Sequence, residues 1–208
     1  MSRYTGSKCR LCRRQGLKLL LKGPRCLSNK CAFEKRPFPP GPQRGGRRRV
    51  SSYGTQLREK QKVRFIYGIT ERQFNNYFAR AIKLPGLPGE TLLVLLEKRL
   101  DNVVFRLGLA DSRSDARQMV RHGHYLINGK KASIPSLLVQ KGDAITLSDK
   151  GKSNLKIKEI TEEKGPANIP GWIEYNTETR QASLVSEPKR SDIEYDVQEK
   201  LIVEFYSR

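Results

Sequence analysis

The stretch RLDNVVFRLGLADSRSDARQMVRHGHYLINGKK, residues 99–131, decides the fold. Its first part continues a helical pattern that begins at Leu92 and ends at Gly108. The apolar residues on one face of this pattern are Leu92, Leu95, Leu96, Leu100, Val103, Val104 and Leu107. Ser112 and Asp115 then have the spacing of a capping box, which predicts a second helix over SDARQMVRHG. The inward face of this helix is expected to hold Ala116, Met119 and Val120.

A β-hairpin is expected directly after the second helix. Asn128–Gly129 separates two short runs in HYLINGKKA, and this dipeptide favours the tight turn of a two-residue hairpin. Arg113, Arg117 and Arg121 recur every four residues, so we expect them to line one exposed face of the helix. Residues 98–141 hold nine Lys or Arg against three Asp. The stretch therefore predicts a positively charged helix-turn-helix-hairpin module.

Other patterns complete an α+β fold. LREKQKVRFIYG and TERQFNNYFARAI predict helices closed by Gly68 and opened by Thr70, and Phe74, Tyr77, Phe78 and Ile82 are expected on one buried face. AITLS, GWIEY and QASLV predict a small antiparallel sheet that holds Trp172 in its core. The apolar face of DVQEKLIVEFYSR predicts a terminal helix that docks on residues 55–97.

Three regions follow from these patterns. Residues 1–45 are expected to form a four-cysteine, metal-stabilised arm with a basic linker. Residues 46–97, completed by a C-terminal helix at 192–208, are expected to form a helical domain. Residues 98–191 are expected to form the inserted module and its small sheet.

Charge is distributed unevenly along the chain. Residues 1–64 carry 19 Lys and Arg against two acids, a net +17, which leaves +3 of the total +20 for residues 65–208. A basic arm on a nearly balanced body is typical of proteins that bind a phosphate backbone, although a solvated basic tail is the simpler alternative. Leu17–Leu21 is too short to span a membrane, and the N-terminal residues lack the pattern of a secretory signal.

The four cysteines are spaced C-x2-C, thirteen residues, C-x4-C, which is typical of a tetrahedral four-thiolate site. Cys9, Cys12, Cys26 and Cys31 are therefore candidate ligands of a structural Zn²⁺. An iron–sulfur cluster, disulfides and free thiols remain alternatives. Because residues 1–45 have few apolar side chains, the metal would stabilise a segment that lacks a core.

The module sequence resembles the alpha-L RNA-binding fold. With the cysteine pattern, LREKQKVRFIYGITERQF and EKLIVEFYSR, the chain resembles the family of bacterial ribosomal small-subunit protein number four along essentially its whole length, in its metal-carrying branch. Where the alpha-L motif commonly has a second basic residue after Ser-Arg, this chain has Ser114 and Asp115.

This resemblance implies a ribosomal protein of the small subunit, in a cytoplasmic or organellar ribosome. It implies primary binding to the 5′ domain of 16S rRNA, nucleation of 30S assembly and a contribution to decoding accuracy. The implied partners are small-subunit protein number five and mRNA in the channel by which it enters the subunit. No membrane partner and no enzymatic activity are expected.

RNA contacts are expected from arginine and lysine side chains, because structured RNA is recognised mainly through its shape, phosphates and 2′-hydroxyls. The candidates are Arg44, Arg47, Arg48, Arg49, Arg58, Lys60, Arg64, Arg113, Arg117, Arg121, Lys130 and Lys131. His122 and His124 are expected to pack at a helix end rather than to act in catalysis. Two alternative functions are an RNA-modifying enzyme, for which no catalytic motif is present, and a zinc-dependent DNA-binding regulator.

Overall fold

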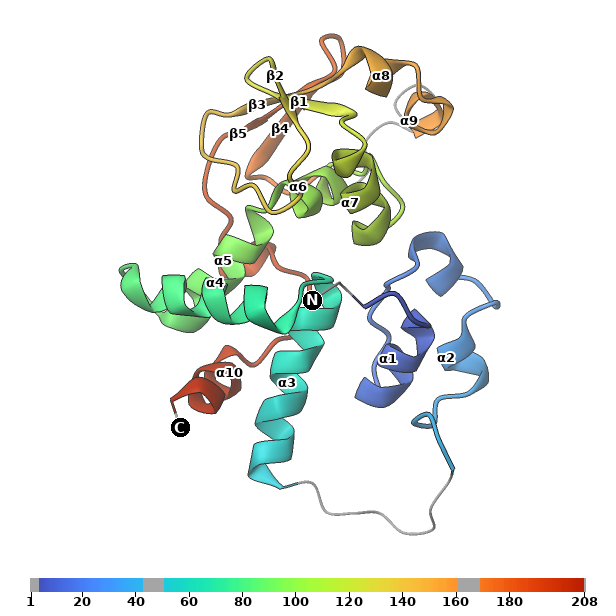
Figure 1. Ribbon diagram of the computed structural model, residues 1–208, viewed down its shortest axis with the longest axis vertical. Coiled ribbons are helices and arrows are strands. Elements are labelled where there is room, and N and C mark those ends of the chain that lie inside the picture. The colour runs from blue at the N-terminus through green and yellow to red at the C-terminus, as the bar shows by residue number, and fades with distance from the viewer. Residues whose placement is uncertain (1–3, 43–50, 161–168, 208) are drawn as a thin grey trace. The chain divides into compact units, whose positions relative to one another are not determined.

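The computed structural model describes residues 4–42, 51–160 and 169–207 (Figure 1). The chain forms two compact units, of which the first joins Met1–Leu92 to Tyr195–Arg208 and the second is Leu93–Glu194. The division falls within α5 (Pro88–Glu97), a few residues from the boundaries expected after residues 97 and 191.

The first unit is helical in its described residues. Its elements, with the start of α5, are α1 (Lys8–Gln15), the 3₁₀ turn η1 (Gly23–Cys26), α2 (Ala32–Lys35), α3 (Ser52–Ile66), α4 (Glu71–Lys83) and α10 (Glu199–Tyr206). The hydroxyl of Ser51 caps α3 by accepting from the Gly54 amide, so this helix begins at Ser52, before the LREKQKVRFIYG stretch that predicts it. The hydroxyl of Thr70 accepts from the Gln73 amide, as its position in the sequence predicts.

The buried face of α4 differs from the expected stripe at two residues. Phe74, Phe78 and Ala81 are buried, whereas Tyr77 is only partly buried and Ile82 is 56 % exposed, so the expected burial of Ile82 is wrong. The buried line follows the spacing i, i+4, i+7, which places Ile82 off this face in the last turn of the helix.

The C-terminal helix α10 docks on the helices of the first unit, as its apolar face predicts. It lies beside α3, and the Tyr206 ring stacks on Phe78 with a centroid separation of 4.4 Å (Figure 1). Gly89, at the start of α5, lets the backbone of α5 lie close to the start of α10. A Cβ atom at Gly89 would lie 2.6 Å from Cβ of Glu199.

The second unit places helices against a sheet. Its described elements after α5 are α6 (Leu100–Arg106), α7 (Arg113–Arg121), β1 (Tyr125–Ile127), β2 (Lys130–Ala132), β3 (Ala144–Leu147), α8 (Asp149–Lys152), α9 (Leu155–Glu159), β4 (Ile173–Asn176), β5 (Gln181–Leu184) and the 3₁₀ turn η3 (Arg190–Asp192).

The single helix expected from Leu92 to Gly108 is wrong, because the chain breaks between α5 and α6. At the break Arg99 forms an isolated antiparallel bridge with Leu138, and the Leu100 amide donates to the Leu137 carbonyl at 2.8 Å. A distant segment therefore supplies the backbone partners that helix continuation would have supplied. All seven apolar residues of the pattern are nevertheless buried.

The strands form one antiparallel sheet in the order β2-β1-β3-β5-β4. The predicted hairpin is present, with Tyr125 opposite Ala132 and with Asn128 and Gly129 both at positive φ, 49° and 76°. The core of the unit joins α6, α7 and the sheet, and Trp172 is buried in it as expected. This packing holds α7 through Ala116, Met119 and Val120, and Figure 1 shows the helix beside α6.

Candidate nucleic-acid interface

Exposed cations gather where α7 ends and the hairpin begins. Arg121 is exposed in the last turn of α7, and Lys130 and Lys131 are exposed on β2. The Lys131 side chain lies over Gly123, since a Cβ atom at Gly123 would come within 2.3 Å of Lys131 Cε. Gly123 has a φ of +75° and leaves the space that this lysine occupies. Two chain segments thus bring positive charge to one end of α7.

Arg113 and Arg117 do not lie on an open face, and the expectation that they do is wrong. Their side chains are only 11 % and 19 % exposed. Arg113 Nε donates to Asn102 Oδ1 at 2.7 Å, and its guanidinium lies 4.4 Å from the centroid of Phe105. Arg117 Nη1 donates to Asp101 Oδ2 at 3.1 Å. Of the three α7 arginines, only Arg121 is exposed to solvent.

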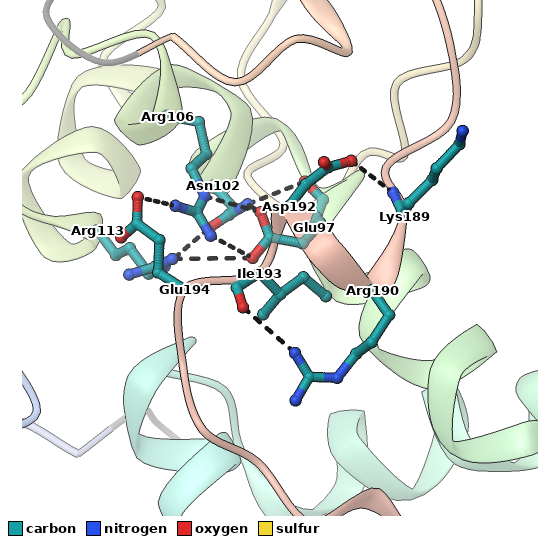
Figure 2. Close-up of polar contacts among 9 residues, drawn as sticks. All are labelled: Glu97, Asn102, Arg106, Arg113, Lys189, Arg190, Asp192, Ile193 and Glu194. Carbon is teal, nitrogen blue, oxygen red and sulfur yellow. Dashed lines mark hydrogen bonds and ion pairs between the residues drawn. The ribbon is translucent and has the colours of Figure 1, made fainter.

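A buried polar cluster holds these two arginines, and Figure 2 shows the part of it around Glu97 and Arg113. Glu97 is 1 % exposed and accepts from Arg106 Nε at 2.9 Å, from Arg106 Nη2 at 3.2 Å and from Asn102 Nδ2 at 2.7 Å. Arg106 also pairs with Glu194 at 3.2 Å. A second pair joins the fully buried Arg99 to Asp101 through two hydrogen bonds of 3.0 and 2.8 Å.

Sequence reasoning missed this cluster. The sequence does contain a pattern that could have predicted the cluster, because Glu97 and Asp101 stand four residues apart within an otherwise apolar helical pattern. Acids in such positions are rarely buried without a cationic partner, and the pattern supplies Arg99 and Arg106.

The opposite end of α7 carries acids. Lys156 of α9 pairs with Asp111 at 2.8 Å and with Asp115 at 2.6 Å. Burial alone would lower the pKa of Lys156, but its hydrogen bonds to the two carboxylates outweigh that effect and raise it. Asp115, one of the two residues that depart from the alpha-L motif, therefore ties α9 to α7.

Of the two histidines at the end of α7, only His124 packs as expected. His124 is 5 % exposed, and its Nδ1 lies 3.3 Å from the Lys150 carbonyl oxygen, whereas His122 is exposed. Nearby, the Ser148 hydroxyl donates to the Gly123 carbonyl at 2.9 Å. A Cβ atom at Gly151 would lie 2.3 Å from the His124 carbonyl oxygen, so α8 approaches this turn as closely as a glycine allows.

The candidates on α3 differ in exposure. Arg58 is exposed, whereas Lys60 is 4 % exposed and pairs with Glu71. Burial removes the Lys60 ammonium from any surface that RNA could reach, which corrects its expected role. Arg64 is partly buried and pairs with Glu71 at 3.0 Å. The remaining candidates, Arg44, Arg47, Arg48 and Arg49, lie outside the described residues.

The four cysteines lie on neighbouring elements of the arm. Cys9 and Cys12 are on α1, Cys26 ends η1, and Cys31 precedes α2; none forms a disulfide, and all but Cys9 are buried. The Lys22 amide donates to Cys26 Sγ at 3.3 Å. Among the described residues, however, no group of three His, Cys, Asp or Glu side chains has an arrangement that would hold a metal ion.

The thiols are nevertheless close enough to influence one another. Burial raises the pKa of the Cys12 thiol, a hydrogen bond from the Leu19 backbone lowers it, and the charges of the other three cysteines raise it further. Two basic side chains join parts of the arm that are distant in the sequence. Arg13 Nε donates to the Phe38 carbonyl at 2.7 Å, and Lys18 pairs with Glu34.

Membrane insertion finds no support in the helices that the structure describes, since none is long and apolar enough to cross a bilayer.

Comparison with known proteins covers the whole chain. Residues 3–97 match the family described as Ribosomal protein S4/S9 N-terminal domain, and residues 98–145 match the S4 domain. The Small ribosomal subunit protein uS4 of Pelotomaculum thermopropionicum is 54 % identical over 208 residues, and that of Clostridium tetani is 53 % identical over 208 residues. Both alignments span 100 % of each chain. The chain therefore belongs to the uS4 family of small ribosomal subunit proteins.

Proposed function

We propose that this protein binds the 5′ domain of 16S rRNA as a primary binder and nucleates assembly of the 30S subunit. As a member of the uS4 family, it is a structural constituent of the small ribosomal subunit and not an enzyme. The net +17 within residues 1–64 supports a phosphate-rich partner, because each phosphate contact releases condensed counterions.

One observation carries the proposal, namely the exposed cations Arg121 and Lys131 at one end of α7, with Lys130 exposed on the same strand as Lys131. The Lys131 side chain lies over Gly123 and Arg121 extends from a packed helix, so both cations arise from fixed backbone positions. An RNA helix offers phosphates and 2′-hydroxyls at fixed spacings, and positioned cations can distinguish one RNA shape from another. Arg58 supplies a further exposed cation on α3.

Further roles follow from the resemblance stated above. The cationic arm would contact mRNA in the channel by which it enters the subunit, and the protein would contribute to decoding accuracy. Contact with small-subunit protein number five belongs to the same proposal. The charge excess of the arm supports the mRNA role, since it suits a single strand whose sequence varies.

A structural Zn²⁺ held by Cys9, Cys12, Cys26 and Cys31 is also proposed. The donor set fits zinc, because four cysteine sulfurs leave no open coordination position. Three of these thiols are buried without a disulfide, and the Lys22 amide already donates to one sulfur, as outer-shell groups of thiolate sites do. When bound, the ion would stabilise the fold of the arm. An iron–sulfur cluster would use the same ligands and would be distinguished by its iron and sulfide content.

The test of RNA binding is a comparison of affinities. The full-length chain is titrated with the 5′ domain of 16S rRNA and with a scrambled RNA of equal length across a salt series. We expect a preference of roughly a thousandfold for the 5′ domain at physiological salt, within the usual range for specific binding. Equal affinities that fall together with salt would instead show a general polyanion binder.

A further inference from the structure

The turn of the β1–β2 hairpin contains a chemically reactive pair of residues (Figure 1). Asn128 and Gly129 form the whole turn, because Ile127 and Lys130 on either side of it are paired with each other. Both turn residues are exposed to solvent. An asparagine before a glycine is prone to deamidation, because glycine has no side chain to hinder attack by its backbone nitrogen on the asparagine carboxamide.

Deamidation of this pair would take two steps. In the first, the Gly129 nitrogen loses its proton to hydroxide and forms a bond to Cγ of Asn128, while the bond from Cγ to Nδ2 breaks and ammonia leaves. In the second, water adds to one of the two carbonyl groups of the resulting succinimide ring and breaks the bond from that carbonyl to the ring nitrogen. The product has a carboxylate at residue 128 in place of the carboxamide. The first step requires a carboxamide that is free to turn toward the Gly129 nitrogen.

The fold holds the Asn128 carboxamide at both of its polar atoms. Nδ2 donates to Asp143 Oδ1 at 2.8 Å, and Oδ1 accepts from the Ala144 amide at 2.9 Å. The Asn128 backbone amide also donates to the Ala144 carbonyl at 2.9 Å. The carboxamide must therefore leave two partners at the start of β3 before its Cγ can be attacked.

Asp143 is itself fixed by a second turn. Its Oδ2 accepts from the Gln140 amide at 2.7 Å, and its own amide donates to the Gln140 carbonyl at 3.1 Å. Each carboxylate oxygen thus has a partner in a different turn. A carboxylate held in this way keeps its other oxygen directed at Asn128, and hydrogen bonds to an ionised group are among the stronger ones in proteins.

We propose that Asn128 is a deamidation site whose reaction the fold suppresses through Asp143 and the Ala144 amide, and that deamidation then removes the contact that suppressed it. The carboxamide is a hydrogen-bond donor to Asp143, whereas the product carboxylate has no proton to donate. Two carboxylates would face each other where the carboxamide and Asp143 now lie 2.8 Å apart, and like charges at this distance repel. A single event would therefore loosen the turn from β3.

The first test measures the rate of deamidation at residue 128 by peptide mapping and mass spectrometry, in the full-length folded chain at mildly alkaline pH. Asp143→Ala removes the acceptor. Asp149→Ala removes the same charge from a fully exposed side chain of the same unit. Val139→Ala lowers the stability of that unit at a fully buried position and leaves the turn contacts in place.

We expect Asp143→Ala to deamidate about tenfold faster than the wild type, the factor that one hydrogen bond to a charged group supplies. Both control variants should deamidate near the wild-type rate. Equal acceleration in Asp143→Ala and Val139→Ala would overturn the proposal, because general unfolding would then control the reaction. A wild-type rate equal to that of the chain unfolded in urea would also overturn it, since the fold would then give no protection.

The second test exchanges the two side chains. Asn128→Asp imitates the main-chain-intact product, and the double variant Asn128→Asp/Asp143→Asn again pairs one carboxamide with one carboxylate. We expect amide hydrogen exchange in β1 and β2 to be about tenfold faster in Asn128→Asp and to return close to the wild-type rate in the double variant. A double variant that exchanges as fast as Asn128→Asp would contradict the repulsion between carboxylates. Neither test uses RNA, so the inference stands or falls separately from the proposed function.

Discussion

Lys60 and Arg58 lie two residues apart on α3 and are expected to respond oppositely to substitution. Lys60 pairs with Glu71 and lies 4.5 Å from the centroid of the Phe205 ring on α10. Lys60→Met removes both contacts while keeping an unbranched, apolar stem. Glu71 is not left without a partner, since it is 40 % exposed and keeps Arg64 and the Tyr206 hydroxyl.

The expected loss of stability follows from these contacts. The ion pair contributes about 0.5–1 kcal/mol at this exposure, and the cation–π contact contributes about 0.5–1 kcal/mol. Lys60→Met should therefore lower the free energy of unfolding of the first unit by about 1–2 kcal/mol. That loss corresponds to a roughly five- to thirtyfold faster amide hydrogen exchange in α10, if exchange proceeds by opening of this helix.

The assay pairs hydrogen exchange with RNA binding across a salt series. Arg58→Gln is the matched variant, for which we expect unchanged exchange in α10 and a salt slope reduced by about one. For Lys60→Met we expect faster exchange and an unchanged slope. A Lys60→Met variant with a reduced slope and unchanged exchange would refute the argument, since Lys60 would then act on RNA rather than on the fold.

Three further predictions concern the turn at the end of α7 and the arm. Gly151→Ala should destabilise the second unit by about 1–3 kcal/mol in chemical denaturation, because its Cβ would meet the His124 carbonyl, whereas Gly171→Ala should have little effect since no atom lies within 4 Å of its added Cβ. Burial lowers the pKa of His124 from 6.5, a hydrogen bond to the Lys150 carbonyl opposes this, and the charges of Lys150 and His122 lower it further, so the neutral form is favoured in the folded state. The stability that neutral His124 contributes is therefore fully present above pH 6.5 and is lost as the pH falls through the lower pKa of the folded state. Denaturation followed by Trp172 fluorescence should show this loss of stability at low pH in the wild type and not in His124→Gln. Removal of the proposed Zn²⁺ from the arm should make residues 1–45 sensitive to limited proteolysis while the second unit stays folded.

Each of these predictions has a contrary outcome. Equal stability of the Gly151→Ala and Gly171→Ala variants would show that α8 can move away from the turn. A His124→Gln variant that keeps the acid-dependent loss would assign it to another group, and His122→Gln serves as the exposed control. An arm that resists protease equally before and after verified metal removal would contradict the structural role of the metal.

Local chemistry is what the sequence reveals best. The hairpin follows from Asn128 and Gly129, whose conformations need positive φ, and the start of α4 follows from the hydroxyl of Thr70. Both signals act within a few residues of the feature that they predict. The buried positions of α6 and α7 likewise follow from helical periodicity.

Features that depend on distant partners could not be predicted in this way. The break between α5 and α6 exists because Leu137 and Leu138 supply backbone partners from another part of the chain. Spacing of four residues also cannot distinguish an arginine in water from one held by an acid. Arg113 and Arg117 are held by residues of α6, whereas Arg121, on the same period, is exposed.

The central claim is that a set of exposed cations binds rRNA phosphates, and the salt dependence of binding tests it most directly. The test variant replaces four candidate cations with glutamine, namely Arg58, Arg121, Lys130 and Lys131. The control replaces four other exposed cations with glutamine, namely Lys83, Lys152, Lys189 and Lys200. Both variants carry the same net charge, so any difference between them reflects position.

The quantity to measure is the slope of log affinity against log salt for the 5′ domain of 16S rRNA. We predict that the test variant loses about three to four from the wild-type slope, close to one for each phosphate contact removed, and that the control loses less than about one. Equal losses in the two variants would contradict the account, because RNA would then respond to the total charge of the chain and not to the cations that the fold positions.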